Sequence, residues 1–296
     1  MALVATLVAN PSNPVLTSEI AEQAAEAVNA SGLYWLADGV ACDIALRDGT
    51  DAQAAEANIL AVISNAPIDL VIQEQETRRK KLLIADMDST MIGQECIDEL
   101  AAEVGLKEKV ATITARAMNG EIAFEPALRE RVALLKGLPI SVVDEVIAKR
   151  ITLTPGGPEL LATMKSKGHY TALVSGGFTV FTSRIAATLG FDENRANTLL
   201  EDGGILSGFV AEPILGKQAK VDALNEISAR LGISPEEAIA VGDGANDLGM
   251  LHLAGSGVAL HAKPAVAAEA QMRINHGDLT ALLYIQGYRK TDFVTV

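Results

Sequence analysis

Short apolar runs alternate with amphipathic stretches along the first quarter of the chain. Apolar runs bounded by turn residues are typical of strands, whereas apolar positions three and four residues apart are typical of helices. These patterns predict strands at 2–9, 33–36, 40–46 and 68–72, and helices at 17–29 and 51–64. The dipeptide Asp38-Gly39, between the second and third strands, is a strong hairpin signal. The order βαββαβ is that of a ferredoxin-like domain, which we expect over residues 1–75.

A charged segment at 73–81 separates this domain from the rest of the chain, and we expect it to be a solvated connector. The run Leu82-Leu83-Ile84-Ala85 follows it, and a continuous apolar run is typical of a strand buried on both faces of a parallel sheet. The next stretch carries helical patterns without an intervening strand, at 94–103, 107–118, 124–135 and 141–150. Such an insertion suggests a helical cap over a site, which we assign to residues 94–151.

Strands and helices alternate again from residue 154 onward. The apolar runs predict strands at 170–174, 238–241, 257–260 and 272–274, and a hairpin formed by 197–200 and 205–210. The intervening amphipathic stretches predict helices at 159–167, 180–189, 217–231, 248–254, 264–270 and 279–286. Alternation of this kind implies right-handed crossovers and a doubly wound parallel sheet. We therefore expect an α/β core formed by residues 80–93 and 152–296.

Polar loops follow some of the expected core strands. They are Asp86-Met87-Asp88-Ser89-Thr90, Ser175-Gly176-Gly177 and Gly242-Asp243-Gly244-Ala245-Asn246-Asp247. Each loop alone could be an ordinary polar turn, but ligands of open α/β sheets bind beyond the carboxyl ends of the strands.

The first of these loops holds two carboxylates two residues apart. If residues 86–88 are extended, Asp86 and Asp88 project from one face, because strand side chains alternate. Repulsion between two close carboxylates raises the pKa of one of them. One carboxylate can then act as a nucleophile or metal ligand while its neighbour acts as an acid.

Composition and charge limit the class of partner. The chain has 296 residues, 49% of them hydrophobic and 21% charged, and its net charge is −14 at pH 7. This length allows about two domains. The acidic balance disfavours nucleic acid, which requires a basic face, and also docking on anionic membranes. Apolar stretches are all well short of the roughly 20 residues that span a bilayer, so we expect no membrane segment.

The cysteines and the N-terminus bear on localisation. Cys42 and Cys96 do not form a paired motif, and we expect both to be reduced thiols. The apolar run near the N-terminus has no basic segment before it, so we expect no signal peptide. Together these features predict a cytoplasmic protein.

The order of the polar loops resembles the motif set of the haloacid dehalogenase-like phosphatases over about residues 80–290. The resemblance includes Lys220 on the helix before the third loop, Glu95 after the first loop, and Phe124 to Val132 in the insertion. Within that superfamily the pattern is most similar to the phosphoserine phosphatases. The resemblance implies a haloacid dehalogenase-like core with a helical cap, and a small-molecule substrate, phosphoserine.

The N-terminal residues lie outside this resemblance. In layout alone they are similar to an ACT-type amino-acid-sensing module. A role in docking or in forming a homodimer is equally open for residues 1–75.

The resemblance implies Mg²⁺-dependent hydrolysis of O-phospho-L-serine, the last step of serine biosynthesis, through an aspartyl-phosphate. It makes Asp86 the nucleophile, while Asp88 protonates the departing serine hydroxyl and then activates water. Mg²⁺ prefers oxygen ligands, which the carboxylates of Asp86 and Asp243 and the backbone carbonyl of Asp88 would supply, with Asp247 mainly behind them. The implied phosphate contacts are Ser175, Gly176, Lys220 and Asn246.

The cap residues implied to recognise the serine end are Glu95 for the ammonium and Arg131 for the carboxylate, through its planar fork. Met118 and Phe124 would add apolar cover. An alternative for Glu95 is an acid in the first helical turn, favoured there by the helix dipole. An alternative for Arg131 is a solvated helix face shared with Arg129.

Other functions remain open from the sequence. The same chemistry could act on another small phosphomonoester, such as phosphohomoserine or phosphoethanolamine. A non-catalytic amino-acid sensor is disfavoured, because Asp86, Asp88, Lys220 and Asp243 are all present. A metal-transporting ATPase shares the aspartyl-phosphate logic, but the missing membrane spans exclude it.

Overall fold

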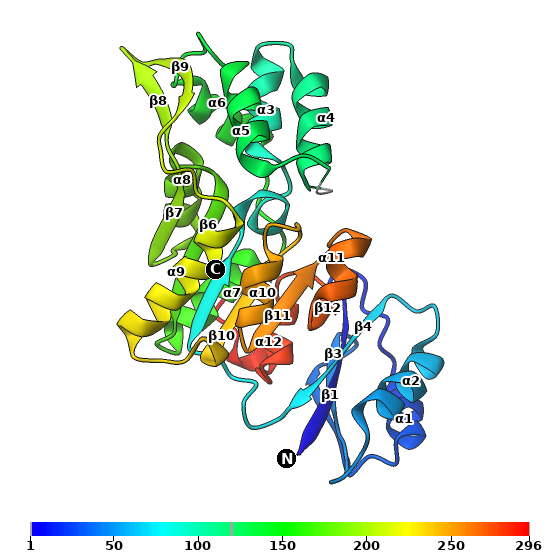
Figure 1. Ribbon diagram of the computed structural model, residues 1–296. Coiled ribbons are helices and arrows are strands. Elements are labelled where there is room, and N and C mark those ends of the chain that lie inside the picture. The colour runs from blue at the N-terminus through cyan, green and yellow to red at the C-terminus, as the bar shows by residue number, and fades with distance from the viewer. Residues whose placement is uncertain (1, 119–120, 296) are drawn as a thin grey trace.

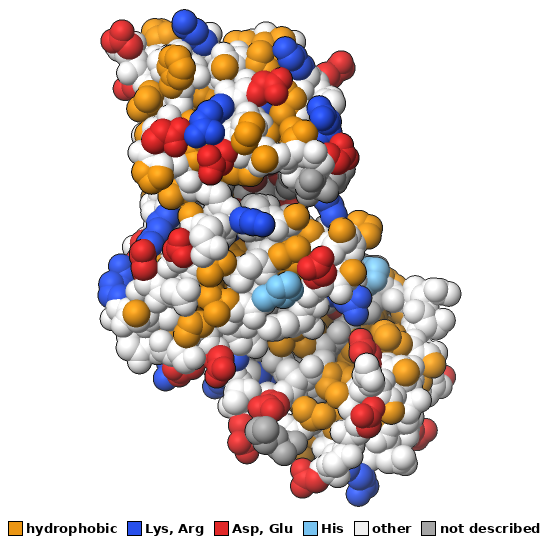
Figure 2. All heavy atoms as spheres, in the orientation of Figure 1, with side chains coloured by type: hydrophobic (Ala, Val, Ile, Leu, Met, Phe, Trp, Pro, Cys, Tyr) orange, Lys and Arg blue, Asp and Glu red, His pale blue; other side chains and the backbone are white. Residues whose placement is uncertain are grey.

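The computed structural model describes residues 2–118 and 121–295. Within these residues the strands form a four-stranded sheet of order β2-β3-β1-β4, a six-stranded sheet of order β12-β11-β10-β5-β6-β7, and the two-stranded hairpin β8-β9 (Figure 1). Searched over the same residues, the structure contains no helix whose length and apolar character suit a membrane crossing. Figure 2 shows basic and acidic side chains interspersed on the visible face, rather than one basic surface.

The N-terminal sheet is antiparallel and carries two helices on its outer face (Figure 1). Side chains at the helix starts explain where those helices begin, since Thr17 and Asp51 each accept a backbone N–H of the first turn. The predicted order βαββαβ is confirmed. Its elements are β1 (Leu3–Ala9), α1 (Ser18–Ala27), β2 (Gly32–Ala37), β3 (Ala41–Ala45), α2 (Ala52–Ile63) and β4 (Ile68–Glu74).

The core sheet is parallel in every strand pair that the structure describes. Its strands are β5 (Leu82–Ala85), β6 (Tyr170–Phe178), β7 (Glu193–Asn197), β10 (Ala238–Gly242), β11 (Ser256–Leu260) and β12 (Met272–Ile274). Successive residues of β5 enter different apolar clusters: Leu83 packs in one, and Leu82 and Ile84 in the other. Both faces of the sheet are therefore covered, and the predicted doubly wound α/β fold is confirmed.

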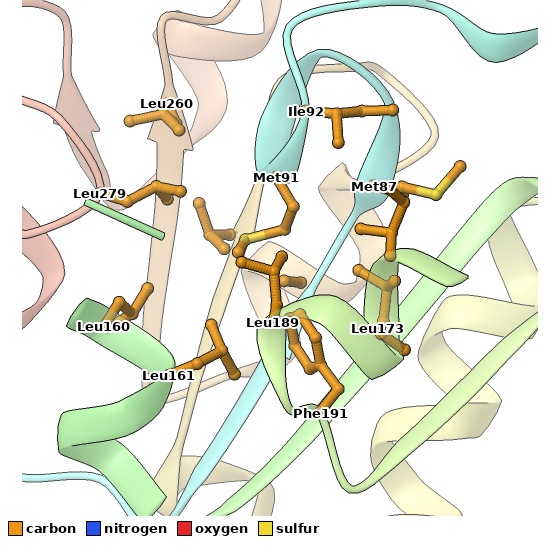
Figure 3. Packing of buried hydrophobic residues seen from close by; sticks show 14 of the residues in the cluster. Met87, Met91, Ile92, Leu160, Leu161, Leu173, Leu189, Phe191, Leu260 and Leu279 are labelled. Atoms are coloured by element: carbon orange, nitrogen blue, oxygen red, sulfur yellow. The ribbon is translucent and has the colours of Figure 1, made fainter. Parts of the chain in front are cut away.

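Helices cover both faces of this sheet. They are α7 (Gly157–Ser166), α8 (Thr179–Leu189), α9 (Lys217–Leu231), α10 (Leu248–Leu253), α11 (Pro264–Glu269) and α12 (Ala281–Ile285). Figure 3 shows one of the apolar clusters beneath the turn that follows β5, where Met91 packs near Leu161 and Leu189. Met87 and Met91 are fully buried, so this turn is anchored in the core.

The predicted helical cap is confirmed, and it stands beyond the carboxyl ends of the core strands (Figure 1). Its helices are α3 (Cys96–Glu103), α4 (Lys107–Met118), α5 (Phe124–Ala133) and α6 (Val142–Arg150). The two connections between cap and core run side by side. Ile92 pairs with Leu153, and the Gln94 side chain makes two hydrogen bonds of 2.9 Å with Thr152.

The prediction of a hairpin arm at 197–200 is wrong in its boundaries. Residues 193–197 form β7 at the edge of the core sheet, and the hairpin strands are β8 (Leu199–Asp202) and β9 (Ile205–Val210). The sequence of β7 is Glu-Asn-Arg-Ala-Asn, and an edge strand this polar lacks the apolar run by which strands are recognised.

The β8–β9 hairpin packs against the cap rather than on the core sheet (Figure 1). Leu206 donates to the Leu138 carbonyl and accepts from the Gly137 N–H, both at 2.9 Å. The roof over the core is therefore built from two separate segments of the chain.

The segment at 73–81 is only in part the solvated connector that its charges predict: residues 75–77 are exposed, but the segment also makes buried contacts. Lys80 is buried, and its ammonium donates to the Glu236 carbonyl at 2.8 Å. Arg78 forms an ion pair with the buried Asp43 at 2.8 Å. These contacts attach the N-terminal sheet to the core.

A buried carboxylate completes this attachment. Asp69 on β4 accepts the backbone N–H groups of Asn275, His276 and Gly277 at 2.8, 3.0 and 2.8 Å. Val8 and Val71 of the same sheet belong to the apolar cluster that also fills the core. The N-terminal domain is thus docked through both apolar and polar contacts.

We predict that Asp69→Ala lowers the free energy of unfolding by about 1–3 kcal/mol, because it leaves backbone donors without their acceptor. The change should be measured by urea unfolding, followed by circular dichroism and by the fluorescence of Trp35, the single tryptophan of the chain. Asp48→Ala, at an exposed position of the same domain, is the control and should change stability by less than about 0.5 kcal/mol. Equal effects of the two substitutions would contradict the docking role of Asp69.

Candidate active site

A cavity of about 980 Å³ lies between the cap and the carboxyl ends of the core strands. Its floor comes from the loops after β5 and β10 and from the end of β6, and its roof comes from cap helices. Many of the residues singled out from the sequence line it: Asp86, Asp88, Glu95, Phe124, Arg131, Ser175, Gly176 and Asn246.

Asp86 is held rigidly at the floor. Its Oδ1 accepts the N–H of Met87 at 2.8 Å and the Lys220 ammonium at 2.7 Å, and its own N–H donates to the Val241 carbonyl. Burial, with the nearby Asp247 carboxylate, raises the pKa of Asp86 to about 7. These bonds fix the rotation of the carboxylate.

Three carboxylates crowd together at this point. Ligand oxygens of Asp86, Asp243 and Asp247 all lie within 4.8 Å of one another, and each residue is buried. Burial, followed by the charge of Asp86, raises the pKa of Asp243 to about 8. Such pKa values show that an additional positive charge would be stabilised here.

Lys220 offsets part of this negative charge. Its ammonium lies 2.7 Å from Asp86 Oδ1 and 2.5 Å from Asp247 Oδ1. Burial lowers the pKa of Lys220, but the two carboxylates outweigh burial and raise it. Three carboxylates and one ammonium leave two negative charges uncompensated when all are ionised. The oxygen-only donor set and this excess of charge fit a hard divalent cation.

Asp88 has a different environment from Asp86. Its Oδ1 accepts the Cys96 N–H at 3.2 Å, and it has no ion pair among the described residues. Burial, and then the charges of Glu95 and Asp86, raise the pKa of Asp88 well above its ordinary range. The neighbouring carboxylates therefore differ in environment: Asp86 is paired with a lysine, whereas burial and nearby negative charge act on Asp88 without an ion pair among the described residues.

Glycines let the end of β6 approach the site. Ser175 is buried, and its Oγ accepts the Gly177 N–H at 2.9 Å. A Cβ at Gly177 would lie 2.9 Å from Asp88 Oδ2, and one at Gly176 would lie 3.1 Å from the Phe124 ring. Any side chain at Gly177 would thus press on Asp88.

The cap lines the cavity with two arginines and two glutamates: Glu125 and Arg129 pair with each other and are exposed, whereas Arg131 is buried. Arg131 is only 5% exposed and donates to Thr114 Oγ1 at 2.9 Å and to the Ala127 carbonyl at 3.1 Å. Glu95 accepts the Ser89 hydroxyl at 2.7 Å. The alternative of a solvated Arg131 is wrong, because on this helix Arg129 is the exposed arginine, paired with Glu212.

Asn246, Asp247 and Met118 are the remaining predicted residues, and they lie at different places relative to the cavity. Asn246 lines the cavity, whereas Asp247 is fully buried and accepts the Gly244 N–H at 3.0 Å, behind the cavity wall. The backbone of Met118 ends α4, but its side chain lies outside the described residues.

Thr114 is a cavity residue that the sequence reasoning missed. It accepts a hydrogen bond from Arg131 and donates one to Asp98 Oδ1 at 2.9 Å. Its position on the buried stripe of α4, beside Val110 and Ile113, is the signal that could have revealed it, since a polar side chain on such a stripe needs a partner.

Residues 83–252 match the family model described as haloacid dehalogenase-like hydrolase. A Schizosaccharomyces pombe protein named "Probable phosphoserine phosphatase" is 43% identical over 242 residues, 81% of each chain. A phosphoserine phosphatase from a Polaromonas species is 49% identical over 208 residues, 69% of this chain and 88% of its own.

Solved structures agree with these matches. A haloacid dehalogenase family hydrolase from Salmonella enterica serovar Typhi superposes with a TM-score of 0.85 and 30% identity, covering 97% of this chain and 98% of its own. A phosphoserine phosphatase carrying an analogue of its phospho-aspartyl intermediate gives a TM-score of 0.66 at 43% identity, covering 70% of this chain and 98% of its own. The chain described here therefore belongs to the haloacid dehalogenase-like hydrolases.

Proposed function

We propose that this protein is a Mg²⁺-dependent phosphoserine phosphatase that hydrolyses O-phospho-L-serine to L-serine and phosphate. The observation that carries the proposal is one cavity with Asp86 and Asp88 in its floor and Glu95 and Arg131 in its roof. The floor suits a phosphate ester, and the opposite charges of Glu95 and Arg131 suit the ammonium and carboxylate of an amino acid. Relatives named phosphoserine phosphatases at 42–49% identity support it.

Asp86 is the nucleophile of the first step. Its carboxylate forms a bond to phosphorus while the bond from phosphorus to the serine oxygen breaks. Asp88, whose raised pKa favours the protonated form, gives its proton to the departing serine oxygen. Serine leaves as the neutral alcohol, and an aspartyl-phosphate remains on Asp86.

Asp88 then acts as a base in the second step. It takes a proton from water as the water oxygen attacks phosphorus, which releases phosphate and restores Asp86. The Ser175 hydroxyl, the Gly176 N–H, Lys220 and Asn246 hold the phosphate oxygens in both steps.

The metal ligands would be the carboxylates of Asp86 and Asp243 and the backbone carbonyl of Asp88. A bound Mg²⁺ there would neutralise charge on the phosphate and orient it for in-line attack. Asp247 would act from behind by holding Lys220, to which it is hydrogen-bonded.

The predicted core and cap would have separate roles in the reaction. The core, residues 80–93 and 152–296, carries the chemistry, and the cap, residues 94–151, recognises serine and excludes water during transfer. Phe124 covers the site from the start of α5.

We predict that Asp86→Asn folds normally but loses phosphate release by at least about a thousandfold, because a neutral amide is a poor nucleophile. The measurement is turnover on phosphoserine, together with acid-quenched labelling for the phosphoenzyme and a thermal melt for the fold. A folded variant that keeps a tenth of the wild-type rate would contradict the assignment.

We predict that a chelator abolishes activity and that added Mg²⁺ restores it. Asp243→Asn should raise the Mg²⁺ concentration for half-maximal activity by about tenfold or more, since it removes a charged ligand. Asp202→Asn, an exposed residue of the hairpin, is the matched control and should leave that concentration unchanged. Full activity in a metal-free sample would overturn the metal proposal.

We predict that Arg131→Ala lowers kcat/KM on phosphoserine by roughly 30-fold to several thousandfold. Loss of one partner from a desolvated charged contact costs about 2–5 kcal/mol, at about 1.4 kcal/mol per tenfold. On phosphoethanolamine, which lacks the carboxylate, the loss should be much smaller. Arg116→Ala is the control on the neighbouring helix α4, where an exposed arginine outside the cavity lining contributes little.

The comparison of these two esters tests substrate choice directly. Equal losses on both with Arg131→Ala would show that Arg131 serves the phosphate or the fold. A wild-type preference for phosphoethanolamine or phosphohomoserine over phosphoserine would replace the proposed substrate.

A further inference from the structure

The end of β6 leaves the regular pairing with β7. Val174 pairs with Arg195 and Phe178 pairs with Asn197, so four steps along β6 oppose two steps along β7. Residues 175–177 therefore bulge out of the ladder, and their backbone groups need other hydrogen-bond partners. This bulge contains Ser175 and Gly176, which line the cavity.

The Asn197 side chain provides such a partner. Its Nδ2 donates to the Gly176 carbonyl at 2.9 Å and to the Leu215 carbonyl at 3.2 Å, and its Oδ1 accepts the Leu215 N–H at 2.8 Å. Asn197 is only 2% exposed. Only one orientation of the amide places its NH₂ group toward the two carbonyls and its oxygen toward the N–H. A side chain that lacks either a donor or an acceptor could not make all three bonds.

The two segments that Asn197 joins both contact the same cap residue. A Cβ at Gly176 would lie 3.1 Å from Phe124 Cζ, and one at Gly216 would lie 3.6 Å from Phe124 Cδ1. Residues 213–216 also line the cavity. The Phe124 ring therefore lies between two backbone segments whose separation is set by the Asn197 amide.

We infer that Asn197 is a positioning residue that fixes the phosphate-binding bulge at Gly176 to residues 215–216 and so forms the slot that receives Phe124 of the cap. This inference rests on the proposed function, since it takes Gly176 as a phosphate ligand. Asn197 touches neither phosphate nor metal in this scheme. It acts by holding the backbone of Gly176, which contacts the phosphate.

Loss of this amide should act at the phosphate end of any substrate. A displacement of about 1 Å in a positioning group can cost on the order of a hundredfold in rate. Phosphoserine and phosphoethanolamine share the phosphate, so both should lose equally. Mg²⁺ activation should not change, because the carboxylates that would bind the metal, Asp86 and Asp243, lie in the loops after β5 and β10.

The test compares Asn197→Ala and Asn197→Asp with wild type. The aspartate is isosteric and keeps the acceptor for the Leu215 N–H, but it directs a carboxylate at two carbonyl oxygens. Asn194→Ala is the matched control, because Asn194 lies on the same strand and accepts a hydrogen bond from Thr182, away from the site. If Asn197→Ala fails to fold, the isosteric Asn197→Asp carries the test.

The measurements are binding of inorganic phosphate by calorimetry in Mg²⁺, kcat/KM on both esters, the Mg²⁺ concentration for half-maximal activity, and the melting temperature. We expect phosphate binding to weaken about tenfold and kcat/KM to fall about 10- to 100-fold, equally on both esters, in the Asn197 variants alone. Metal activation should stay within about twofold of wild type.

Unchanged phosphate binding in a folded Asn197 variant would overturn the inference, as would the same loss in Asn194→Ala. A loss confined to phosphoserine would also overturn it. The binding measurement uses inorganic phosphate and does not require turnover of phosphoserine. A wild-type protein that does not hydrolyse phosphoserine would therefore refute the proposed function, while the phosphate-binding test of Asn197 would still apply.

Discussion

The rest of the site depends on the ion pairs that the buried Lys220 ammonium forms with Asp86 and Asp247. Burial drives carboxylates toward their neutral forms, and an adjacent cation opposes this. Lys220 supports the ionised form of Asp86, while Asp88 has no such partner among the described residues and favours the acid. Replacing Lys220 would leave two buried carboxylates without their cation, at a cost of about 3–5 kcal/mol, whereas Asp86→Asn leaves the ammonium its bond to Asp247.

The floor of the cavity is packed into the core of the protein, whereas its roof is a separate part of the fold. Beneath the floor, Met87 and Met91 are fully buried in the core (Figure 3), so the turn that carries Asp86 and Asp88 cannot shift without disturbing that packing. The roof is joined to the core through short paired connections. Under the proposed function, phosphoryl transfer would therefore depend on fixed geometry, whereas recognition of the amino-acid end would depend on groups of the cap.

Much of this arrangement follows from local patterns, and some of it cannot. Buried parallel strands such as β5 appear as apolar runs, so the core and its polar loops are predictable. The polar edge strand β7 has no such signal, and its Asn197 acquires a role only through a bulge in the neighbouring strand. Likewise Arg129 and Arg131 are alike in sequence, and only packing of the cap decides that Arg131 faces inward.

The division of the roof into two chain segments has a mechanical consequence. The helices join the core through two connections that pair with each other at Ile92 and Leu153, and the hairpin joins it through two strands whose base is closed by the Ala211 N–H, which donates to the Thr198 carbonyl at 2.8 Å. A rigid body held at two points keeps one freedom, which is rotation about the line joining them. A roof moving as one body would therefore rotate about a single axis.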